Sequence, residues 1–296
     1  MSAPATIESV RARLTDSLVF LPDKPEETAE STARALWLKA AGVPASAQRA
    51  MTMDLPALSP HQGVELDRLI ERRLTGVPLA HLTSRQNFLG LEMLAGAGAL
   101  VPRRETELLA RTAIARVSGQ EDRVLEIVDV CTGSGNVALS LAHHFPEARV
   151  NAADLSPDAV SLARENCTHL GLDARVTFHC GDLLAPFDTP EFLGRVHLLT
   201  CNPPYINSAK VERMPAEISA HEPRLAFDGG ALGIGILMRL IREAPRFLRA
   251  GGWVAFEVGL GQGQALVKRM QGNTAYRQVQ PAMDETGAIR VVTAQC

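Results

Sequence analysis

A regular alternation of apolar runs and helical segments, which begins near residue 124, constrains the fold of this chain more than any other feature. Runs such as 123–130 (RVLEIVDV) and 195–201 (RVHLLTC) are largely apolar, as are strands buried on both faces of a parallel sheet. Segments with helical spacing separate them, and one of these, 156–171, opens with Ser-Pro, a helix start signal. The pattern predicts an α/β fold with a doubly wound, mostly parallel sheet and helices on both faces.

The pattern also places each strand and helix of this sheet. Strands are expected at 123–130, 148–154, 174–180, 195–201 and 251–259, with two more between 276 and 295. Helices are expected at 135–145, 156–171, 231–251 and 263–271. The last two strands follow each other without a helix, so they break the alternation and predict an antiparallel edge.

The first third of the chain has a different organisation. Helical spacing predicts three helices at 7–21, 25–43 and 59–76, the second of which stops at Gly42. Glycines then separate two short β-like runs up to Pro102, which predicts a hairpin, and helical spacing resumes over 103–117. We therefore expect three parts, listed here with their bounds: an N-terminal helical domain (1–85), a β-hairpin linker (86–103) and the α/β domain (104–296).

Composition and charge exclude several classes of function. A formal net charge of −3 gives no overall basic excess, so no direct nucleic-acid specificity is expected. The 5 cysteines form no CxxC pair and no zinc-like spacing with histidine, which indicates reduced thiols, a cytoplasmic protein and no metal site. The N-terminus shows no signal-peptide pattern, and no run is long and apolar enough to span a membrane.

The segment DVCTGSGNVA (129–138) follows the first strand of the predicted sheet. Gly133 and Gly135 permit a tight turn and let a ligand approach the backbone closely. The spacing Gly133-x-Gly135-x-x-Ala138 also fits a dinucleotide fingerprint. A glycine-rich turn that binds nothing is the alternative.

Two acids follow the next two predicted strands. Asp154 lies about 20 residues beyond Gly135, where an acid accepts hydrogen bonds from ribose hydroxyls. Alternatively it caps the next helix, but Ser156, directly before Pro157, fills that role better. Asp182 could accept from the exocyclic amine of adenine or serve as a turn residue. An adenosine-type ligand is expected, and both a nicotinamide dinucleotide and S-adenosylmethionine are compatible with these acids.

Asn202-Pro203-Pro204-Tyr205 follows the fourth strand. Pro203 lacks an N–H and has a fixed φ, and Pro204 keeps it out of the helical region. Such a rigid turn can aim the Asn202 side chain and the Pro203 carbonyl, both acceptors, at one NH₂ group, and Tyr205 could cover a flat group held there. Two acceptors would orient the lone pair of a carboxamide nitrogen toward an electrophile such as a sulfonium methyl. In the alternative, the prolines only end the strand and Tyr205 is a core aromatic.

Together these motifs resemble the S-adenosylmethionine-dependent methyltransferases that act on planar or exocyclic nitrogens. The closer resemblance is to the protein glutamine-N5 methyltransferases, which modify release factors or a ribosomal protein. It covers most of the chain and runs through GVPLAHLTSRQNFLGLEM (76–93), LVPRRETELL (100–109), NPPYI (202–206), MPAEISAHEPRLAFDGG (214–230), FEVGLGQG (256–263) and DETGAIRVV (284–292).

The resemblance implies a seven-stranded Rossmann-like methyltransferase sheet, S-adenosylmethionine as the cofactor and an N-terminal helical domain that helps to receive a protein substrate. The implied catalytic residues, which would hold the glutamine amide, are Asn202, Pro203 and Tyr205. The implied cofactor-binding residues are Asp129, Thr132, Gly133, Gly135, Asp154, Leu155, Asp182, Leu183 and Asn202. The implied substrate-binding residues are Asn202, Pro203, Pro204, Tyr205, Arg103 and Glu105, and Thr106 is implied to help shape the pocket or its entrance.

Some positions depart from the family pattern. His81 and Ser84 stand where the family usually has tyrosine and glycine, and Cys131 replaces the first glycine of the cofactor loop. Cys131 and HEP (221–223) match the ribosomal-protein branch, whereas RRETELL (103–109) and FDGG (227–230) match the release-factor branch. The expected partner is therefore a release factor or a ribosomal protein.

Three alternatives remain open at this level. The acceptor could be a small-molecule amine or amide, including the amine of the cofactor itself. The GxGxxA spacing also fits a nicotinamide-dependent dehydrogenase. Arg103 and Glu107 could form a surface ion pair instead of shaping a site.

Overall fold

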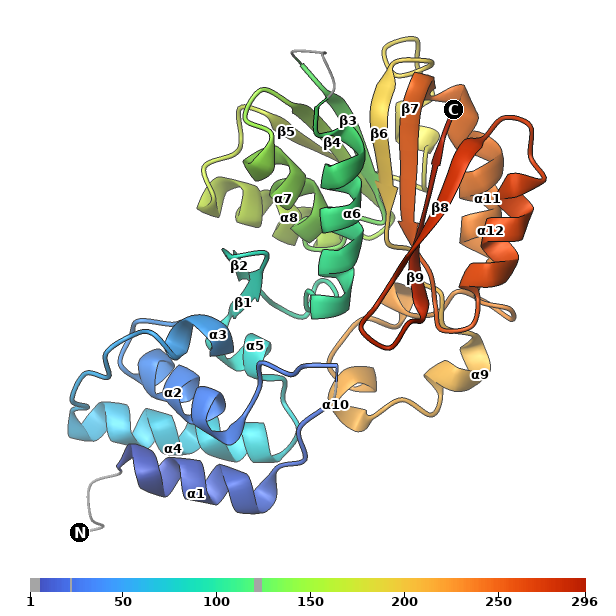
Figure 1. Cartoon of the computed structure of the whole chain (residues 1–296). Helices are drawn as coiled ribbons and strands as arrows, with labels where there is room; N and C mark the ends of the chain where they lie inside the picture. The colour runs from blue at the N-terminus through green and yellow to red at the C-terminus, as the bar shows by residue number, and fades with distance from the viewer. Residues whose placement is uncertain (1–5, 22, 120–123) are drawn as a thin grey trace. The chain divides into compact units, whose positions relative to one another are not determined.

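The computed structural model describes residues 6–21, 23–119 and 124–296, and the chain divides into two compact units (Figure 1). Unit 1 comprises Met1–Ala97, Val101–Arg103 and Pro215–Glu222, and unit 2 comprises Gly98–Leu100, Arg104–Met214 and Pro223–Cys296. The hairpin and the short segment Pro215–Glu222 thus group with the N-terminal helices. The expected domain boundaries after residues 85 and 103 remain predictions.

Unit 1 is mainly helical. Its elements are α1 (Ile7–Ser17), α2 (Ala29–Ala40), α3 (Ala47–Ala50), α4 (Pro60–Leu74), α5 (Leu79–Thr83), α10 (Ala216–Ser219) and an antiparallel hairpin of β1 (Arg85–Phe88) and β2 (Leu91–Leu94). Leu14, Leu36 and Leu69 lie in its apolar core.

Three of the expected bounds in unit 1 were wrong. The first helix ends at Ser17, because its C-cap residue, Leu18, is already extended, with φ −107° and ψ 139°. The second helix begins at Ala29, since Thr28 forms a capping box there and the chain before it is not helical. The second hairpin strand ends at Leu94, well before Pro102.

Ser84, one of the departures from the family pattern, ends α5 in the left-handed conformation with φ 59°. A glycine would adopt this conformation without steric cost. His81, the other departure in this segment, is half-buried, and burial lowers the pKa of its imidazole.

Unit 2 contains the predicted sheet. Its strands are β3 (Glu126–Val130), β4 (Arg149–Asp154), β5 (Val176–Cys180), β6 (Val196–Cys201), β7 (Leu248–Glu257), β8 (Arg277–Met283) and β9 (Ile289–Gln295). The 7-stranded sheet has the order β5-β4-β3-β6-β7-β9-β8. β9 runs antiparallel to both of its neighbours, so the doubly wound sheet and its antiparallel edge are confirmed.

Helices cover both faces of this sheet (Figure 1). They are α6 (Glu107–Val117), α7 (Asn136–His144), α8 (Pro157–His169), α11 (Gly235–Glu243) and α12 (Gly263–Gln271), with the short α9 (Ser208–Val211) between β6 and β7. The path β3-β4-β5 steps one way along the sheet and β6-β7-β8 steps the other way. Right-handed crossovers therefore put α7 and α8 on one face and α11 and α12 on the other.

The expected helix at 231–251 was too long. α11 covers Gly235–Glu243, and the chain then makes a 3₁₀ turn over Ala244–Arg246. Pro245 has no N–H to continue the helical ladder. β7 begins at Leu248, earlier than expected. Arg123, the expected start of the first strand, lies outside the described residues.

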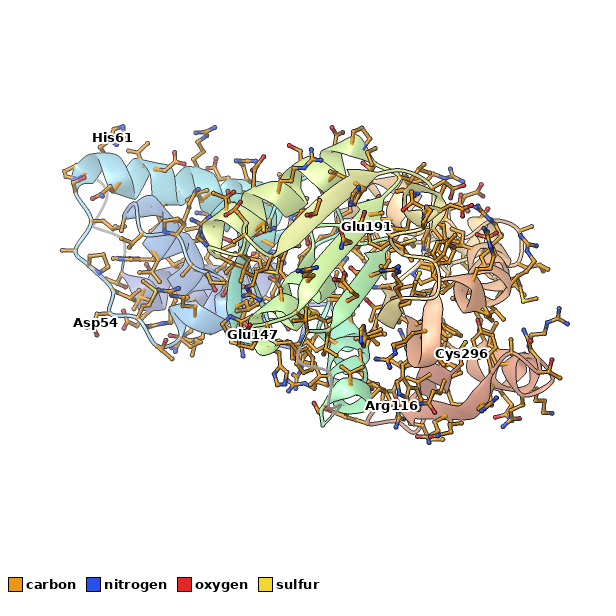
Figure 2. All side chains as sticks on the ribbon, turned by 90° about the horizontal axis from the view of Figure 1, so that it is seen from above. Asp54, His61, Arg116, Glu147, Glu191 and Cys296 are labelled. Carbon is orange, nitrogen blue, oxygen red and sulfur yellow. The ribbon has the colours of Figure 1, made fainter. Side chains whose placement is uncertain are left out.

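Arg116 of α6, labelled in Figure 2, contacts two strands of the sheet. Its Nε donates to Thr293 Oγ1 of β9 at 3.1 Å, and its guanidinium lies 5.1 Å from the ring centroid of Trp253 of β7. These contacts join the C-terminal end of α6 to β9 and β7. None of the helices in the described part of the chain combines the length and apolarity needed to cross a membrane.

Candidate active site

The carboxyl ends of β5, β4, β3 and β6 meet at one edge of the sheet, because these neighbouring strands run parallel. The glycine-rich loop follows β3, Asp154 ends β4, Asp182 follows β5 and Asn202 follows β6. The structure therefore brings these expected site residues of unit 2 to a common edge.

The loop after β3 has an unusual backbone. Cys131, Gly133 and Gly135 have φ values of 57°, 56° and 83°. A Cβ on Gly135 would lie 3.1 Å from Leu139 Cδ1 and 3.2 Å from Ala163 Cβ, so tight packing as well as the positive φ favours glycine there. A Cβ on Gly133 would meet nothing within 4 Å, so this glycine leaves its backbone open to a ligand. Cys131 adopts the left-handed conformation with a side chain, at a cost of about 1 kcal/mol.

Asp129 lies beneath this loop and is 1 % exposed. Its Oδ2 accepts from the Thr132 hydroxyl at 2.6 Å, and its Oδ1 accepts from the Thr200 hydroxyl at 2.6 Å. Burial raises the pKa of Asp129 to about 6, although both hydroxyls act in the opposite direction. Asp129 thus joins the loop to β6.

Asp154 joins the loop to the start of α8. Its Oδ2 accepts from the Gly133 N–H at 2.9 Å, and its Oδ1 accepts from the Ser156 N–H at 2.9 Å. Burial raises the pKa of Asp154. Ser156 caps α8 by accepting from the Ala159 N–H at 3.3 Å, so its expected role is confirmed. Leu155, between the two, is 54 % exposed.

Asp182 lies on the rim of the site after β5. Both of its oxygens accept from Nη1 of Arg239 on α11, at 3.2 and 3.0 Å. The next residue, Leu183, is buried and has a φ of 52°. An amine that binds Asp182 would therefore share its carboxylate with Arg239.

Asn202 and Tyr205 are held by side chains from other elements. Asn202 Nδ2 donates to Thr106 Oγ1 at 3.1 Å. The Tyr205 hydroxyl donates to Glu257 Oε1 at 2.8 Å and accepts from Arg290 Nη2 at 3.3 Å. Burial and the neighbouring Glu257 raise the pKa of Tyr205 well above its ordinary value, so Tyr205 keeps the proton that it donates.

Glu257 is at the centre of this network. Its side chain is 2 % exposed and lies 3.7 Å from Arg290. Burial raises the pKa of Glu257, while the hydrogen bond from Tyr205 and the charge of Arg290 lower it. Arg290 also pairs with Glu105 at 3.1 Å, which places this expected residue at the edge of the network.

The segment after α10 fixes the backbone of the Pro204-Tyr205 turn. A Cβ on Gly229 would lie 2.5 Å from the Pro204 carbonyl oxygen, and one on Gly233 would overlap the Tyr205 carbonyl. Gln262 Nε2 donates to the same Tyr205 carbonyl at 3.0 Å. Two glycines and one glutamine therefore hold this turn in contact with neighbouring backbone.

Arg103 belongs to unit 1, whereas the residues described so far belong to unit 2. It pairs with Glu222 at 2.6 Å and Asp23 at 3.6 Å, and its side chain is 10 % exposed. The alternative of a surface pair between Arg103 and Glu107 was wrong, because Arg103 is largely buried and Glu107 pairs with Arg111. Among the described residues, no group of three or more potential metal-ligating side chains occurs.

Sequence reasoning gave no role to Glu257, Arg290, Gln262 or Thr200. One signal was available: Glu257 is an acid within the apolar run WVAFEVG, and Arg290 is a base within AIRVV. Charged residues in strands that are otherwise buried require partners, and such partners often belong to a site.

Comparison with known proteins identifies the family. Residues 127–221 match the family model described as a methyltransferase domain. A release factor glutamine methyltransferase of Moorella thermoacetica is 40% identical over 237 residues, which are 80% of this chain and 81% of that protein. A ribosomal protein uL3 glutamine methyltransferase of Bradyrhizobium diazoefficiens is 36% identical over 203 residues, 67% of this chain and 62% of that protein.

A solved structure supports the fold. The human methyltransferase 10 domain containing protein superimposes with a TM-score of 0.51 at 15% identity, over 69% of this chain and 88% of that chain. The sequence relatives set aside the dehydrogenase alternative. The chain belongs to the family of release factor and ribosomal protein glutamine methyltransferases, and it is an S-adenosylmethionine-dependent N-methyltransferase.

Proposed function

We propose that this enzyme methylates the side-chain amide nitrogen of a glutamine in a translation protein, and that the acceptor is a release factor. One observation in the structure carries the proposal. Asn202 Nδ2 donates a hydrogen bond to Thr106 Oγ1, so Asn202 Oδ1 is left to accept a hydrogen bond from an incoming amide N–H. The names of the relatives from Moorella thermoacetica and Bradyrhizobium diazoefficiens support a glutamine in a release factor or in ribosomal protein uL3.

The residues at the carboxyl edge of the sheet fit S-adenosylmethionine. The open backbone at Gly133 suits close approach of a ligand, and the carboxylates of Asp154 and Asp182 suit ribose hydroxyls and an adenine amine. We assign Leu155 and Leu183 to contacts with the base. Asp129 and Thr132 would act by shaping the loop. When bound, the cofactor supplies a methyl group on a sulfonium, which is an electrophile.

The acceptor amide would be oriented by the Asn-Pro-Pro-Tyr turn. We propose that Asn202 Oδ1 and the Pro203 carbonyl accept the two N–H groups of the glutamine, and that Pro204 keeps the turn rigid. Tyr205 would cover the flat amide. The two oxygens stabilise the positive charge that develops on nitrogen, and the alkylated nitrogen is acidic enough to lose a proton afterwards without a strong base.

We propose that unit 1 helps to receive the protein acceptor, since it has its own core and holds Arg103, the one expected substrate residue outside unit 2. Glu105 would act at the site entrance through its pair with Arg290. Because the proposed acceptors work in translation, we also propose a cytoplasmic location.

Mass spectrometry of candidate acceptors tests this function. The purified enzyme is incubated with S-adenosylmethionine and a release factor, with uL3, or with no protein. We expect the mass gain of one methyl group on a single glutamine of the release factor, and none when that glutamine is replaced by glutamate, which has no amide. A gain on uL3 alone would reassign the acceptor. Cofactor consumption without protein would favour a small molecule, and no gain on either protein would contradict the proposal.

A further inference from the structure

The side chain of Tyr205 is held at its hydroxyl end by two charged residues. The hydroxyl donates to Glu257 Oε1 at 2.8 Å and accepts from Arg290 Nη2 at 3.3 Å. The guanidinium of Arg290 also lies 5.9 Å from the centroid of the Tyr205 ring. Because the hydroxyl has a single proton to donate, the two hydrogen bonds together fix the direction in which it points.

The main chain at the other end of this side chain is fixed as well. Pro203 and Pro204 restrict the backbone before Tyr205, and Gln262 Nε2 donates to the Tyr205 carbonyl at 3.0 Å. A ring that is fixed at both ends cannot move to another rotamer without breaking the hydrogen bonds of its hydroxyl. Tyr205 is half-buried, so part of its surface remains free to contact a bound partner.

The sheet itself sets the positions of both charged residues. Glu257 is the last residue of β7, and Phe256 before it lies opposite Cys201, the last residue of the parallel strand β6. On the other side of β7, Glu257 lies opposite Val291 of β9, which follows Arg290 in the sequence. Two paired strands therefore present a carboxylate and a guanidinium at the edge of the sheet where the Asn-Pro-Pro-Tyr turn begins.

Packing alone does not require charged residues at this position. Glu257 is 2 % exposed, Arg290 is 7 % exposed, and their charged groups are 3.7 Å apart. Such a pair adds little to stability compared with apolar residues of the same volume, and Glu257 Oε2 has no hydrogen-bond partner among the described residues. Tyr276, the other tyrosine of the chain, is satisfied by a neutral partner, since its hydroxyl donates to the Ile241 carbonyl at 2.8 Å. The charged pair at Tyr205 therefore points to a role in function.

We propose that Glu257 is a positioning residue for methyl transfer: with Arg290 beside it, it holds the hydroxyl end of Tyr205, so that the ring keeps one orientation against the acceptor amide. The inference rests on the proposed function, because it takes Tyr205 to cover a flat amide. Glu257 acts through Tyr205 and needs no contact of its own with the acceptor. Its effect is on turnover rather than on cofactor binding.

Three single variants test the inference by steady-state kinetics of methyl transfer, together with calorimetric binding of S-adenosylmethionine. Tyr205→Phe removes the hydroxyl and keeps the ring, and Glu257→Met removes the acceptor oxygen at a similar side-chain length. Each should lower kcat about tenfold, because the ring is no longer held in place, and should leave Kd for the cofactor within about twofold of the wild type. Glu257→Gln keeps an oxygen for the Tyr205 hydroxyl and should recover kcat to within about threefold of the wild type.

A double variant distinguishes positioning from general damage to the structure. If Glu257 acts through the Tyr205 hydroxyl, the double variant Tyr205→Phe/Glu257→Met should be about tenfold slower than the wild type, as each single variant is, whereas independent effects would multiply to about 100-fold. Tyr276→Phe is the matched control, because it removes the other tyrosine hydroxyl, whose hydrogen bond has the same length of 2.8 Å. Its kcat should stay within about twofold of the wild type.

The possible outcomes separate the two proposals. If the wild type methylates no glutamine, the proposed function fails and this inference fails with it. If the wild type is active, the inference alone is overturned when Tyr205→Phe keeps the wild-type kcat, when Glu257→Gln is as slow as Glu257→Met, or when the losses in the double variant multiply. Should Glu257→Met fail to fold, Tyr205→Phe and Glu257→Gln still decide, since the first must be slow and the second must turn over at nearly the wild-type rate.

Discussion

Asp129 illustrates how a single buried residue sets the shape of the cofactor loop. Its two carboxylate oxygens accept hydrogen bonds from the hydroxyls of Thr132 and Thr200, so Asp129 connects the loop after β3 to strand β6. Burial destabilises the ionised carboxylate by more than these two hydrogen bonds stabilise it, so the pKa of Asp129 is raised to about 6. Asp129 therefore makes the free energy of unfolding depend on pH.

The raised pKa of Asp129 predicts a specific effect of pH on stability. The carboxyl of Asp129 binds its proton more tightly in the folded chain than in the unfolded one, so the free energy of unfolding falls as pH rises through the window between the two pKa values. Relative to Asp129→Asn, which does not titrate, the wild type should lose about 1 kcal/mol between pH 5 and pH 7. Urea unfolding at several pH values measures this. If the free energy of unfolding changed with pH by the same amount in both proteins, Asp129 would not be the source of the pH dependence.

At the scale of elements, the Asn-Pro-Pro-Tyr turn depends on two segments that lie far from it in sequence. Gly229 and Gly233 let the chain after α10 pass directly against the turn, and Gln262 at the start of α12 donates to the Tyr205 carbonyl. Ile206 continues this contact through its bridge with Asp228.

Two glycines in this segment make a matched pair for testing the contact. Both Gly233 and Gly230 have positive φ, but only at Gly233 would a Cβ overlap the Tyr205 carbonyl, whereas Gly230 faces open space. Gly230→Ala should cost about 1 kcal/mol of stability and leave kcat/KM nearly unchanged. Gly233→Ala should cost about 2–3 kcal/mol and lower kcat/KM about tenfold, because it displaces the turn. Equal kcat/KM values for the two variants would mean that this packing does not position Tyr205.

Elements also show where sequence reasoning succeeds and where it stops. Strands such as β3 and β6 are predictable, because burial on both faces leaves a continuous apolar run, and polar residues directly after them mark the site. The start of β7 was missed because its first residues include Arg249 and a glycine pair, and its pairing with β6 is irregular there. Glu257 and Arg290 were missed because their contacts with Tyr205 join residues 52 and 85 positions apart. No local pattern records such a pairing.

On the scale of the whole molecule, the short segment Pro215–Glu222, which follows the active-site motif in the sequence, belongs to unit 1. Glu217 of α10 pairs with Lys24 at 2.8 Å and with Arg73 at 2.9 Å, and Arg73 also pairs with Glu27 at 3.1 Å. Burial alone would raise the pKa of Glu217, but Lys24 and Arg73 outweigh it and lower this pKa. No pattern in the sequence predicts this grouping, because the paired residues come from distant segments of the chain.

This ion network should make Glu217 important for the stability of unit 1. Glu217→Gln removes the negative charge that pairs with Lys24 and Arg73. Above pH 5, where the wild-type carboxylate is ionised, this variant should have a free energy of unfolding about 3 kcal/mol lower than that of the wild type. The two tryptophans make the test selective, because Trp37 lies in unit 1 and Trp253 in unit 2. In a Trp253→Phe background, Trp37 fluorescence follows unit 1 during urea unfolding.

The control for this prediction is an exposed acid of the same unit. Glu65 pairs with Arg68 on the surface at 3.3 Å, and Glu65→Gln should cost less than about 0.5 kcal/mol. If Glu217→Gln cost no more than Glu65→Gln, the buried network would not hold the segment Pro215–Glu222 in unit 1.

The most direct test of the account compares Asn202→Ala with the wild type in two assays, calorimetric binding of S-adenosylmethionine and methyl transfer to the protein acceptor. Asn207→Ala, which removes only the cap of α9, serves as the control. We predict that Asn202→Ala binds the cofactor within about threefold of the wild type but transfers methyl groups at least about 100-fold more slowly, while Asn207→Ala transfers normally. Transfer by Asn202→Ala at the wild-type rate, or a loss of transfer explained entirely by lost cofactor binding, would contradict the assignment of Asn202 as the residue that holds the acceptor amide.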